Sequence, residues 1–399
     1  MRRRFAAKLL IVLLLSAAVV TVLTVYLRPV PGIEATVFAK KFAKDQSVSL
    51  PWPTYGQAAL GAVGYGVLET HGQQNAVPIA SIAKVVTALS VLEKKPLAVG
   101  DKGPEIILTS ADVQLFEDYY SRGGSVVKVQ NGEKITEYEA LQALLLPSAN
   151  NIADSLARWA FGSVLAYTEY ANKLIGDMGL AHTRLADASG FSPDSVSTAQ
   201  ELVQIAQKVL SNPVLAQIVS QQKATLPVAG EVSNVNWLLG TDEVVGIKTG
   251  NTDEAGGCFM FAANRQIEGR QVKIVGAVLG APSRDTAIGD SRPIIAAAGD
   301  GFENKIFIKA GEAIGLYQSP WGALTTAVAK DDVSALVWKG SASHADIKLK
   351  IINTEAGANT EAGTITVTSG QQKAVRKAIL SQPVSGPDWQ WRLTHAILD

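Results

Sequence analysis

A serine and a lysine lie three residues apart in the apolar stretch VPIASIAKVVTALSVLEKK, residues 77–95, as Ser81 and Lys84. The density of apolar residues predicts a buried helix. Positions i and i+3 share one face of a helix, so the hydroxyl and the amine would be neighbours. A serine becomes nucleophilic when a base takes its proton, and a lysine can be that base when burial and a nearby cation lower its pKa towards about 7–8. The pair therefore predicts covalent catalysis.

The S-x-x-K spacing occurs three times, and its surroundings distinguish the three copies. Ser125–Lys128 lies in SVVKV, which predicts a strand, where positions i and i+3 point to opposite faces. Ser220–Lys223 lies in a polar stretch at the end of a helical segment. The copy at 81 and 84 is the one that opens a long apolar helix. Taken alone, that copy also fits a helix start whose lysine extends to solvent.

Two further motifs follow in order. Ser148-Ala149-Asn150 lies in a break between two helical stretches, and Lys248-Thr249-Gly250 ends an apolar strand. S-x-x-K, S-D-N and K-T-G, in that order, mark penicillin-binding proteins and class A β-lactamases. Alone, Ser148 and Asn150 could be helix caps, and Lys248 could be a surface lysine. The ordered set, on helix, loop and strand, favours a catalytic site.

The chain resembles the serine-type D-alanyl-D-alanine carboxypeptidases of the low-molecular-mass penicillin-binding proteins, in the β-lactamase/transpeptidase-like superfamily. The resemblance runs from about residue 55 to 315 and more loosely to the end, and it includes DASGFSPDSVSTAQEL (187–202) and VVGIKTGNTDEAGGCFMFAA (244–263). It implies an α/β (α+β) fold with a central antiparallel sheet, an all-helical insert and a small all-β domain after it. Many members have a C-terminal amphipathic anchor, whereas this chain ends in the short PDWQWRLTHAILD.

The resemblance also implies catalytic roles. Ser81 would be the nucleophile that carries the acyl group, and Lys84 would be the general base. Ser148 would relay a proton between that base and the leaving amine. The implied reaction removes the terminal D-alanine from peptidoglycan stem peptides, needs no metal or cofactor, and makes the protein a target of β-lactams.

Five residues are implied to contact the substrate. Asn150 would hold the substrate's amide, and Lys248 with Thr249 would bind its terminal carboxylate. Gly250 belongs to the strand edge that would pair with the peptide. The backbone N–H groups of Ser81 and Asn251 would form the oxyanion hole, where one donor contributes about 10²–10³-fold in rate.

Other functions use the same motifs. A D,D-endopeptidase or transpeptidase would differ in its cleft and loops, which the sequence does not reveal. A class A β-lactamase needs a glutamate to activate water, and AHTRLADASGFSPD (181–194), where that family has it, contains none. A catalytically silent wall-binding homologue would be expected to carry a broken motif, and all three motifs are intact.

The composition narrows the class of protein. The 399 residues include 36 basic and 36 acidic side chains, so the net charge offers no argument for nucleic-acid binding. The four histidines are scattered, and no Cys/His cluster suggests a metal site. Cys258 is the single cysteine, so no intrachain disulfide can form, and its apolar strand predicts a buried thiol.

The N-terminus predicts a membrane anchor. Residues 9–27, LLIVLLLSAAVVTVLTVYL, carry no charge and are long enough to span about 30 Å of hydrocarbon. Basic residues precede this run, which places residues 1–8 in the cytoplasm and the remainder outside, as a single-pass membrane protein. A cleaved signal peptide is the alternative, but no A-x-A-like site follows the run.

The remaining pattern divides into domains. Residues 28–54 contain several prolines and predict a linker. In the catalytic domain, residues 55–302, short strands lie on both sides of a helical insert, so both ends would build one sheet. One predicted turn of that sheet lies near His71-Gly72. Short alternating strands over residues 303–399 predict a β-sandwich-like domain.

Overall fold

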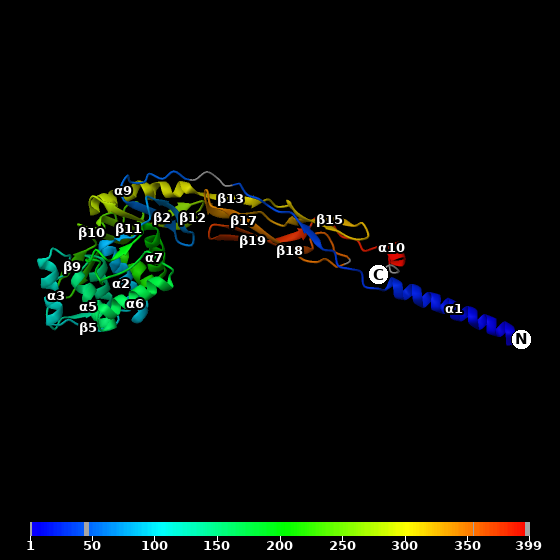
Figure 1. Cartoon of the computed structure of the whole chain (residues 1–399), viewed down its shortest axis with the longest axis horizontal. Coiled ribbons are helices and arrows are strands. Elements are labelled where there is room, and N and C mark those ends of the chain that lie inside the picture. Colours follow the sequence, from blue (N-terminus) through cyan, green and yellow to red (C-terminus); the bar gives the residue numbers. More distant parts are fainter. Residues whose placement is uncertain (1, 44–47, 354, 396–399) are drawn as a thin grey trace. The chain divides into compact units, whose positions relative to one another are not determined.

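The computed structural model describes residues 2–43, 48–353 and 355–395, and the chain divides into two compact units (Figure 1). The larger unit is Ser47–Glu303. The smaller unit combines Met1–Gln46 with Asn304–Asp399, so it is built from both ends of the chain.

The larger unit is organised around a five-stranded antiparallel sheet. Its strand order is β10-β11-β12-β2-β3. Two strands come from the start of the unit and three from its end, which confirms the prediction of a sheet assembled from both sides of a helical insert. The predicted turn near His71-Gly72 corresponds to a bend at Gly72, where φ is +73° and a strand has just ended, whereas the hairpin turn at residues 63–65 was not predicted. The strands are β2 (Gln57–Ala62), β3 (Gly66–His71), β10 (Val244–Thr252), β11 (Gly256–Ile267) and β12 (Arg270–Ala281).

Helices cover the sheet and form the insert. Alternate residues of β12, Val275, Ala277 and Leu279, join the same apolar core as α7, while α9 lies on the other side of the sheet (Figure 1). Thr198 caps α7 by accepting the N–H of Glu201, as its spacing predicts. The helices are α2 (Ala83–Lys94), α3 (Ser110–Ser121), α4 (Glu137–Leu145), α5 (Asn150–Phe161), α6 (Val164–Asp177), α7 (Ala199–Ser211), α8 (Pro213–Val219) and α9 (Arg284–Ala297).

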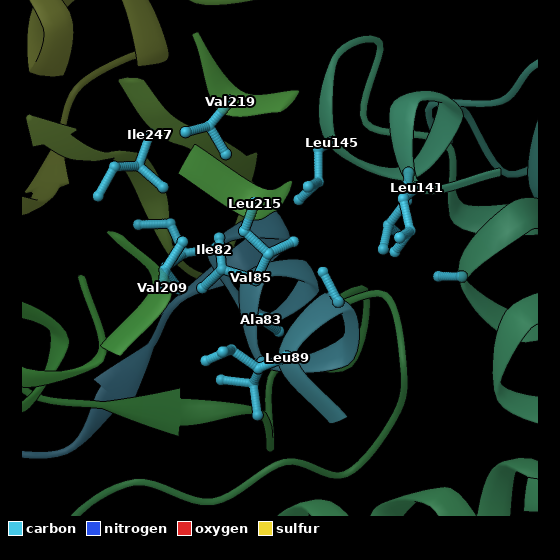
Figure 2. Packing of buried hydrophobic residues seen from close by; sticks show 14 of the residues in the cluster. Ile82, Ala83, Val85, Leu89, Leu141, Leu145, Val209, Leu215, Val219 and Ile247 are labelled. Carbon is cyan, nitrogen blue, oxygen red and sulfur yellow. The ribbon is translucent and has the colours of Figure 1, made fainter. Parts of the chain in front are cut away.

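Helix α2 lies in the middle of the core. Ten of its twelve residues are buried, and each fully buried Leu or Val side chain contributes about 1.5–3 kcal/mol. Figure 2 shows its apolar side chains among residues of α4, α7, α8 and β10. A polar group on this helix is therefore removed from water.

The helix is shorter than its sequence predicts. Val77–Pro78 form the short strand β4, which pairs with β7 (Val196–Ser197), and Ala80–Ile82 form a 3₁₀ turn before α2 begins. Residues before a proline favour extended backbone, and proline itself has no N–H to donate. Ser81 therefore lies in a 3₁₀ turn that leads into the α-helix, and Lys84 lies in the first turn of that helix.

The smaller unit is mostly β-structure, which confirms the predicted all-β domain. Its six-stranded sheet has the order β1-β14-β15-β19-β18-β17, and β13 pairs with β16. A short helix, α10 (Trp389–His395), follows the strands. The strands are β1 (Ala35–Val37), β13 (Phe302–Ile308), β14 (Ala313–Gln318), β15 (Leu324–Ala329), β16 (Val333–Trp338), β17 (Ser343–Leu349), β18 (Glu361–Ser369) and β19 (Gln372–Leu380).

The segment predicted as a linker contributes to this sheet. β1 pairs antiparallel with β14, and Ile33 forms a further bridge with Ile352. The prediction of a plain linker over residues 28–54 is therefore wrong for these residues. Prolines at 29 and 31 precede the strand without interrupting it.

The N-terminal helix α1 spans Arg2–Tyr26. Residues Arg4–Tyr26 are long and apolar enough to cross a membrane, with a mean hydropathy of 2.7, and the segment packs against no protein core. A signal sequence has the same profile. In the larger unit, Cys258 is free and buried, as predicted, and burial raises its thiol pKa to about 12.

Candidate active site

Two glycines allow the chain to close around Ser81. A Cβ at Gly190 would lie 1.9 Å from the carbonyl oxygen of Ala80, and φ is +72° there. A Cβ at Gly250 would lie 3.0 Å from the carbonyl oxygen of Ile79 and 3.1 Å from the backbone nitrogen of Ser81. The third residue of K-T-G therefore brings β10 directly against the backbone of the serine.

Lys84 is fully buried, and three oxygens surround its amine. Nζ lies 2.8 Å from Ser81 Oγ, 2.6 Å from Asn150 Oδ1 and 2.8 Å from the carbonyl oxygen of Ser189. The amide and carbonyl oxygens can only accept, so they hold two N–H bonds of the amine. The third position around the Lys84 nitrogen faces the Ser81 hydroxyl. A neutral amine held in this way directs its lone pair at Ser81, which is the geometry of a general base.

Burial lowers the Lys84 pKa to about 7, and the carboxylates of Asp187 and Asp154 oppose that shift. The positive charges of Lys84 and Lys248 repel each other, so each disfavours the ammonium form of the other. The Lys248 pKa is lowered well below its ordinary value, by burial first and then by Lys84 and Arg284. Desolvation within the core around α2 is thus the dominant cause for both lysines.

The middle motif begins helix α5. The N-cap residue is Ala149, which has no capping side chain, so neither Ser148 nor Asn150 is a side-chain cap. Ser148 is buried in a left-handed conformation, with φ of 68°. Its Oγ has no hydrogen-bond partner within the described ranges, whereas Asn150 reaches Lys84 directly. The backbone N–H of Asn150 donates to the carbonyl of Ser125, which lies in an irregular segment and not in the predicted strand.

The third motif lies on β10, the outer strand of the sheet beside the 3₁₀ turn. Lys248 and Thr249 are buried, so the surface-lysine alternative is wrong. Lys248 Nζ donates to the carbonyl of Thr249 at 3.0 Å. Asn251 is exposed and its Oδ1 accepts the backbone N–H of Arg284 at the start of α9. Arg284 adds a cation that sequence analysis did not single out.

The loop after α6 supplies a contact that sequence analysis missed. The Asp187 carboxylate accepts from the hydroxyls of Ser189 and Ser195 and from the N–H groups of Gly190, Phe191 and Ser192. The loop is therefore a structural turn, and the turn aims the Ser189 carbonyl at Lys84. The Asp-x-Ser-Gly spacing indicates such a turn, but nothing in it indicates the partner.

Residues 63–283 match the D-alanyl-D-alanine carboxypeptidase family, peptidase family S11. The matched region is more than half of the chain and contains the three motifs. The chain therefore belongs to this family. Penicillin-binding protein 5 from Haemophilus influenzae shares the fold, with a TM-score of 0.61 at 19% identity over 85% of this chain and 99% of that one.

Two curated relatives differ in their named activity. A D-alanyl-D-alanine endopeptidase of Pseudomonas aeruginosa is 29% identical over 202 residues, 49% of this chain and 62% of the relative. The D-alanyl-D-alanine carboxypeptidase DacB2 of Mycobacterium tuberculosis is 31% identical over 206 residues, 50% of this chain and 66% of the relative. The chain thus spans less than two thirds of the length of these relatives.

Proposed function

We propose that this protein is a serine-type D-Ala-D-Ala carboxypeptidase that removes the terminal D-alanine from peptidoglycan stem peptides. The observation that carries the proposal is the buried amine of Lys84, held by two carbonyl-type oxygens with its third position at Ser81 Oγ. Membership of the family supports the substrate class. The reaction we propose uses no metal or cofactor.

The reaction proceeds by acyl transfer. Lys84 takes the Ser81 proton as Oγ attacks the carbonyl carbon of the penultimate D-alanine. The carbonyl oxygen becomes an oxyanion, and the backbone N–H groups of Ser81 and Asn251 donate hydrogen bonds to it. The C–N bond then breaks, and the proton passes through Ser148 to the leaving amine of the terminal D-alanine. Water adds to the ester with Lys84 as base, and the shortened peptide leaves.

The substrate's terminal carboxylate would bind at β10. Lys248 is buried beside Thr249, and Arg284 is close enough to lower the Lys248 pKa. A bound carboxylate would compensate this excess of positive charge, which favours substrates that end in a free carboxylate. Asn150 would use its amide group to hold the peptide, and the free edge of β10 with Gly250 would pair with the peptide backbone.

We also propose that α1 anchors the protein in the cytoplasmic membrane, with the chain that follows it outside the cytoplasm. The length and apolar surface of residues Arg4–Tyr26 support this. Alkaline extraction of membranes and N-terminal sequencing test it. Retention in the membrane with an intact N-terminus supports the anchor, and a soluble protein that begins after residue 27 excludes it.

The test of the activity is intact-protein mass spectrometry of the full chain in detergent after exposure to a penicillin, with Ser81→Ala as control. A stable adduct on the wild type and none on the variant supports the proposal. Rapid release of the adduct would instead indicate a β-lactamase. A folded wild type without adduct would contradict the proposal and favour a silent wall-binding homologue.

A D,D-endopeptidase is the second candidate, supported by the name of the P. aeruginosa relative. The two activities differ in the bond that is cut, so muropeptide monomers and crosslinked dimers should be offered separately. Release of D-alanine from monomers supports the carboxypeptidase. Conversion of dimers to monomers without release of D-alanine supports the endopeptidase.

A further inference from the structure

A second carboxylate lies behind the active site. Asp154 is four residues after Asn150 on α5, so both side chains lie on one face of the helix. Asp154 is buried, and its charge is one of the two carboxylate influences on Lys84. Its Oδ2 accepts the hydroxyl of Tyr119 at 2.9 Å, and its Oδ1 has no hydrogen-bond partner in the described part of the chain.

Tyr119 connects this carboxylate to the loop that contains Asp187. It lies on α3, is buried, and packs edge-on against Phe191 of that loop with ring centroids 5.6 Å apart. The guanidinium of Arg122 covers both rings. Because the ring is held on two sides, the hydroxyl that faces Asp154 is fixed in place.

The two carboxylates near Lys84 differ in how their charge is compensated. Asp187 accepts five hydrogen bonds within its own loop. Asp154 accepts one, from Tyr119. A buried carboxylate with few donors is easily protonated, and burial raises the Asp154 pKa to about 6. The charge of Asp154 can therefore change close to neutral pH.

We propose that Asp154 and Tyr119 form a positioning pair that sets the protonation state of Lys84. Ionised Asp154 stabilises the ammonium form of Lys84, and the Tyr119 hydroxyl keeps Asp154 ionised. The pair thereby determines the pH above which Lys84 can act as a base. The inference rests on the proposed function, and it assigns a role to residues outside the three motifs.

Other charged and titratable groups also face this region, and they limit how far Asp154 can change the protonation of Lys84. Asp187 raises the Lys84 pKa, and Lys84 in turn lowers that of Lys248. Arg158, one turn further along α5, lowers the Asp154 pKa. Tyr167 on α6 is hydrogen-bonded to Thr87 of α2, and burial raises its pKa, so its hydroxyl stays protonated. None of these groups is removed by changing Asp154 or Tyr119, so variants at these two positions isolate the pair.

The test is the pH profile of acylation by a penicillin, measured on the full chain in detergent for the wild type, Asp154→Asn and Tyr119→Phe. The acid limb is the part of the profile in which the acylation rate falls as the pH decreases. Asp154→Asn removes the charge that favours the ammonium form of Lys84, so the acid limb moves to lower pH by about half to one unit. Relative to the plateau above pH 8, acylation at pH 6.5 rises about two- to threefold. Tyr119→Phe shifts the limb in the same direction and by less, because it removes the donor that keeps Asp154 ionised.

Asp112→Asn is the matched control. Asp112 is a buried carboxylate on α3 that also contacts α5, through Ser155 and Arg158. Its removal disturbs the same helix pair without removing a carboxylate that acts on Lys84, so its acid limb stays in place. An unshifted limb in Asp154→Asn, with rates lowered equally at all pH values, would assign Asp154 a purely structural role and overturn the inference. If Asp154→Asn does not fold, the limb of Tyr119→Phe decides.

A second readout separates this inference from the proposed function. In ¹³C-lysine-labelled protein, the Lys84 resonance is identified by its loss in Lys84→Arg, and its titration needs no acylation. A lower midpoint in Asp154→Asn supports the pair even if the wild type forms no penicillin adduct. An unchanged midpoint contradicts the pair even if the adduct forms.

Discussion

Replacing Lys84 with methionine should change how stability depends on pH. The Lys84 pKa is about 7 in the folded chain and ordinarily 10.5. Between these values the unfolded chain binds the extra proton, so the free energy of unfolding of the wild type rises with pH. At 1.36 kcal/mol per pKa unit, and with the group half-titrated at each end of the interval, the rise from pH 7 to 10.5 is about 4 kcal/mol. Methionine has a similar volume and no titrating group, so Lys84→Met lacks this rise.

The measurement is denaturant unfolding of both proteins across pH 7–10.5, followed by circular dichroism, because helices α2 to α9 all lie in the larger unit. The quantity of interest is the difference in free energy between the two proteins, which cancels the titrating groups that do not interact with Lys84. The oxygens of Asn150 and Ser189 lose a donor in the variant, but that cost does not depend on pH. Lys94→Met, an exposed lysine on the same helix, is the control. A difference that stays flat from pH 7 to 10.5 would refute the argument that burial prepares Lys84 as a base.

Three further outcomes are expected. Gly250→Ala should lower the acylation rate about tenfold or more at nearly unchanged thermal stability, since its Cβ must push β10 away from the Ser81 backbone. Matching losses of acylation rate and thermal stability would assign this glycine to the fold alone. Ser148→Ala should slow acylation by about 10²–10⁴-fold without loss of folding, as the loss of a proton relay predicts, and an unchanged rate would remove Ser148 from the mechanism. Cys258 should resist alkylation at pH 8 until the chain unfolds, because burial raises its thiol pKa to about 12; rapid modification of folded protein would contradict its burial.

The three motifs identify the residues that meet, and the family resemblance that they carry predicts the fold class. Ser81, Lys84 and Asn150 are joined by hydrogen bonds as their positions suggest. Local patterns were less reliable where tertiary contacts decide. The apolar run at 77–95 does not reveal that Val77–Pro78 pair with a strand more than a hundred residues later.

Contacts made by the backbone are the least visible in a sequence. The Ser189 carbonyl binds Lys84, yet any residue type could supply a carbonyl there. Asp154 is a similar case, since a single aspartate on a helix predicts an exposed charge unless its neighbours in the fold are known. The sequence therefore predicts the reacting groups, but not the groups that orient them or adjust their pKa.

The pairing of β1 with β14 has a consequence for how the protein is made. The paired residues Thr36 and Leu316 lie about 280 residues apart along the chain. Closing a flexible loop of the intervening length would cost about 5 kcal/mol of chain entropy. A nascent chain leaves the ribosome from its N-terminus, so the larger unit can fold before β14 is synthesised. Once the larger unit has folded, most of the intervening loop is no longer flexible, so pairing β14 with β1 costs less chain entropy.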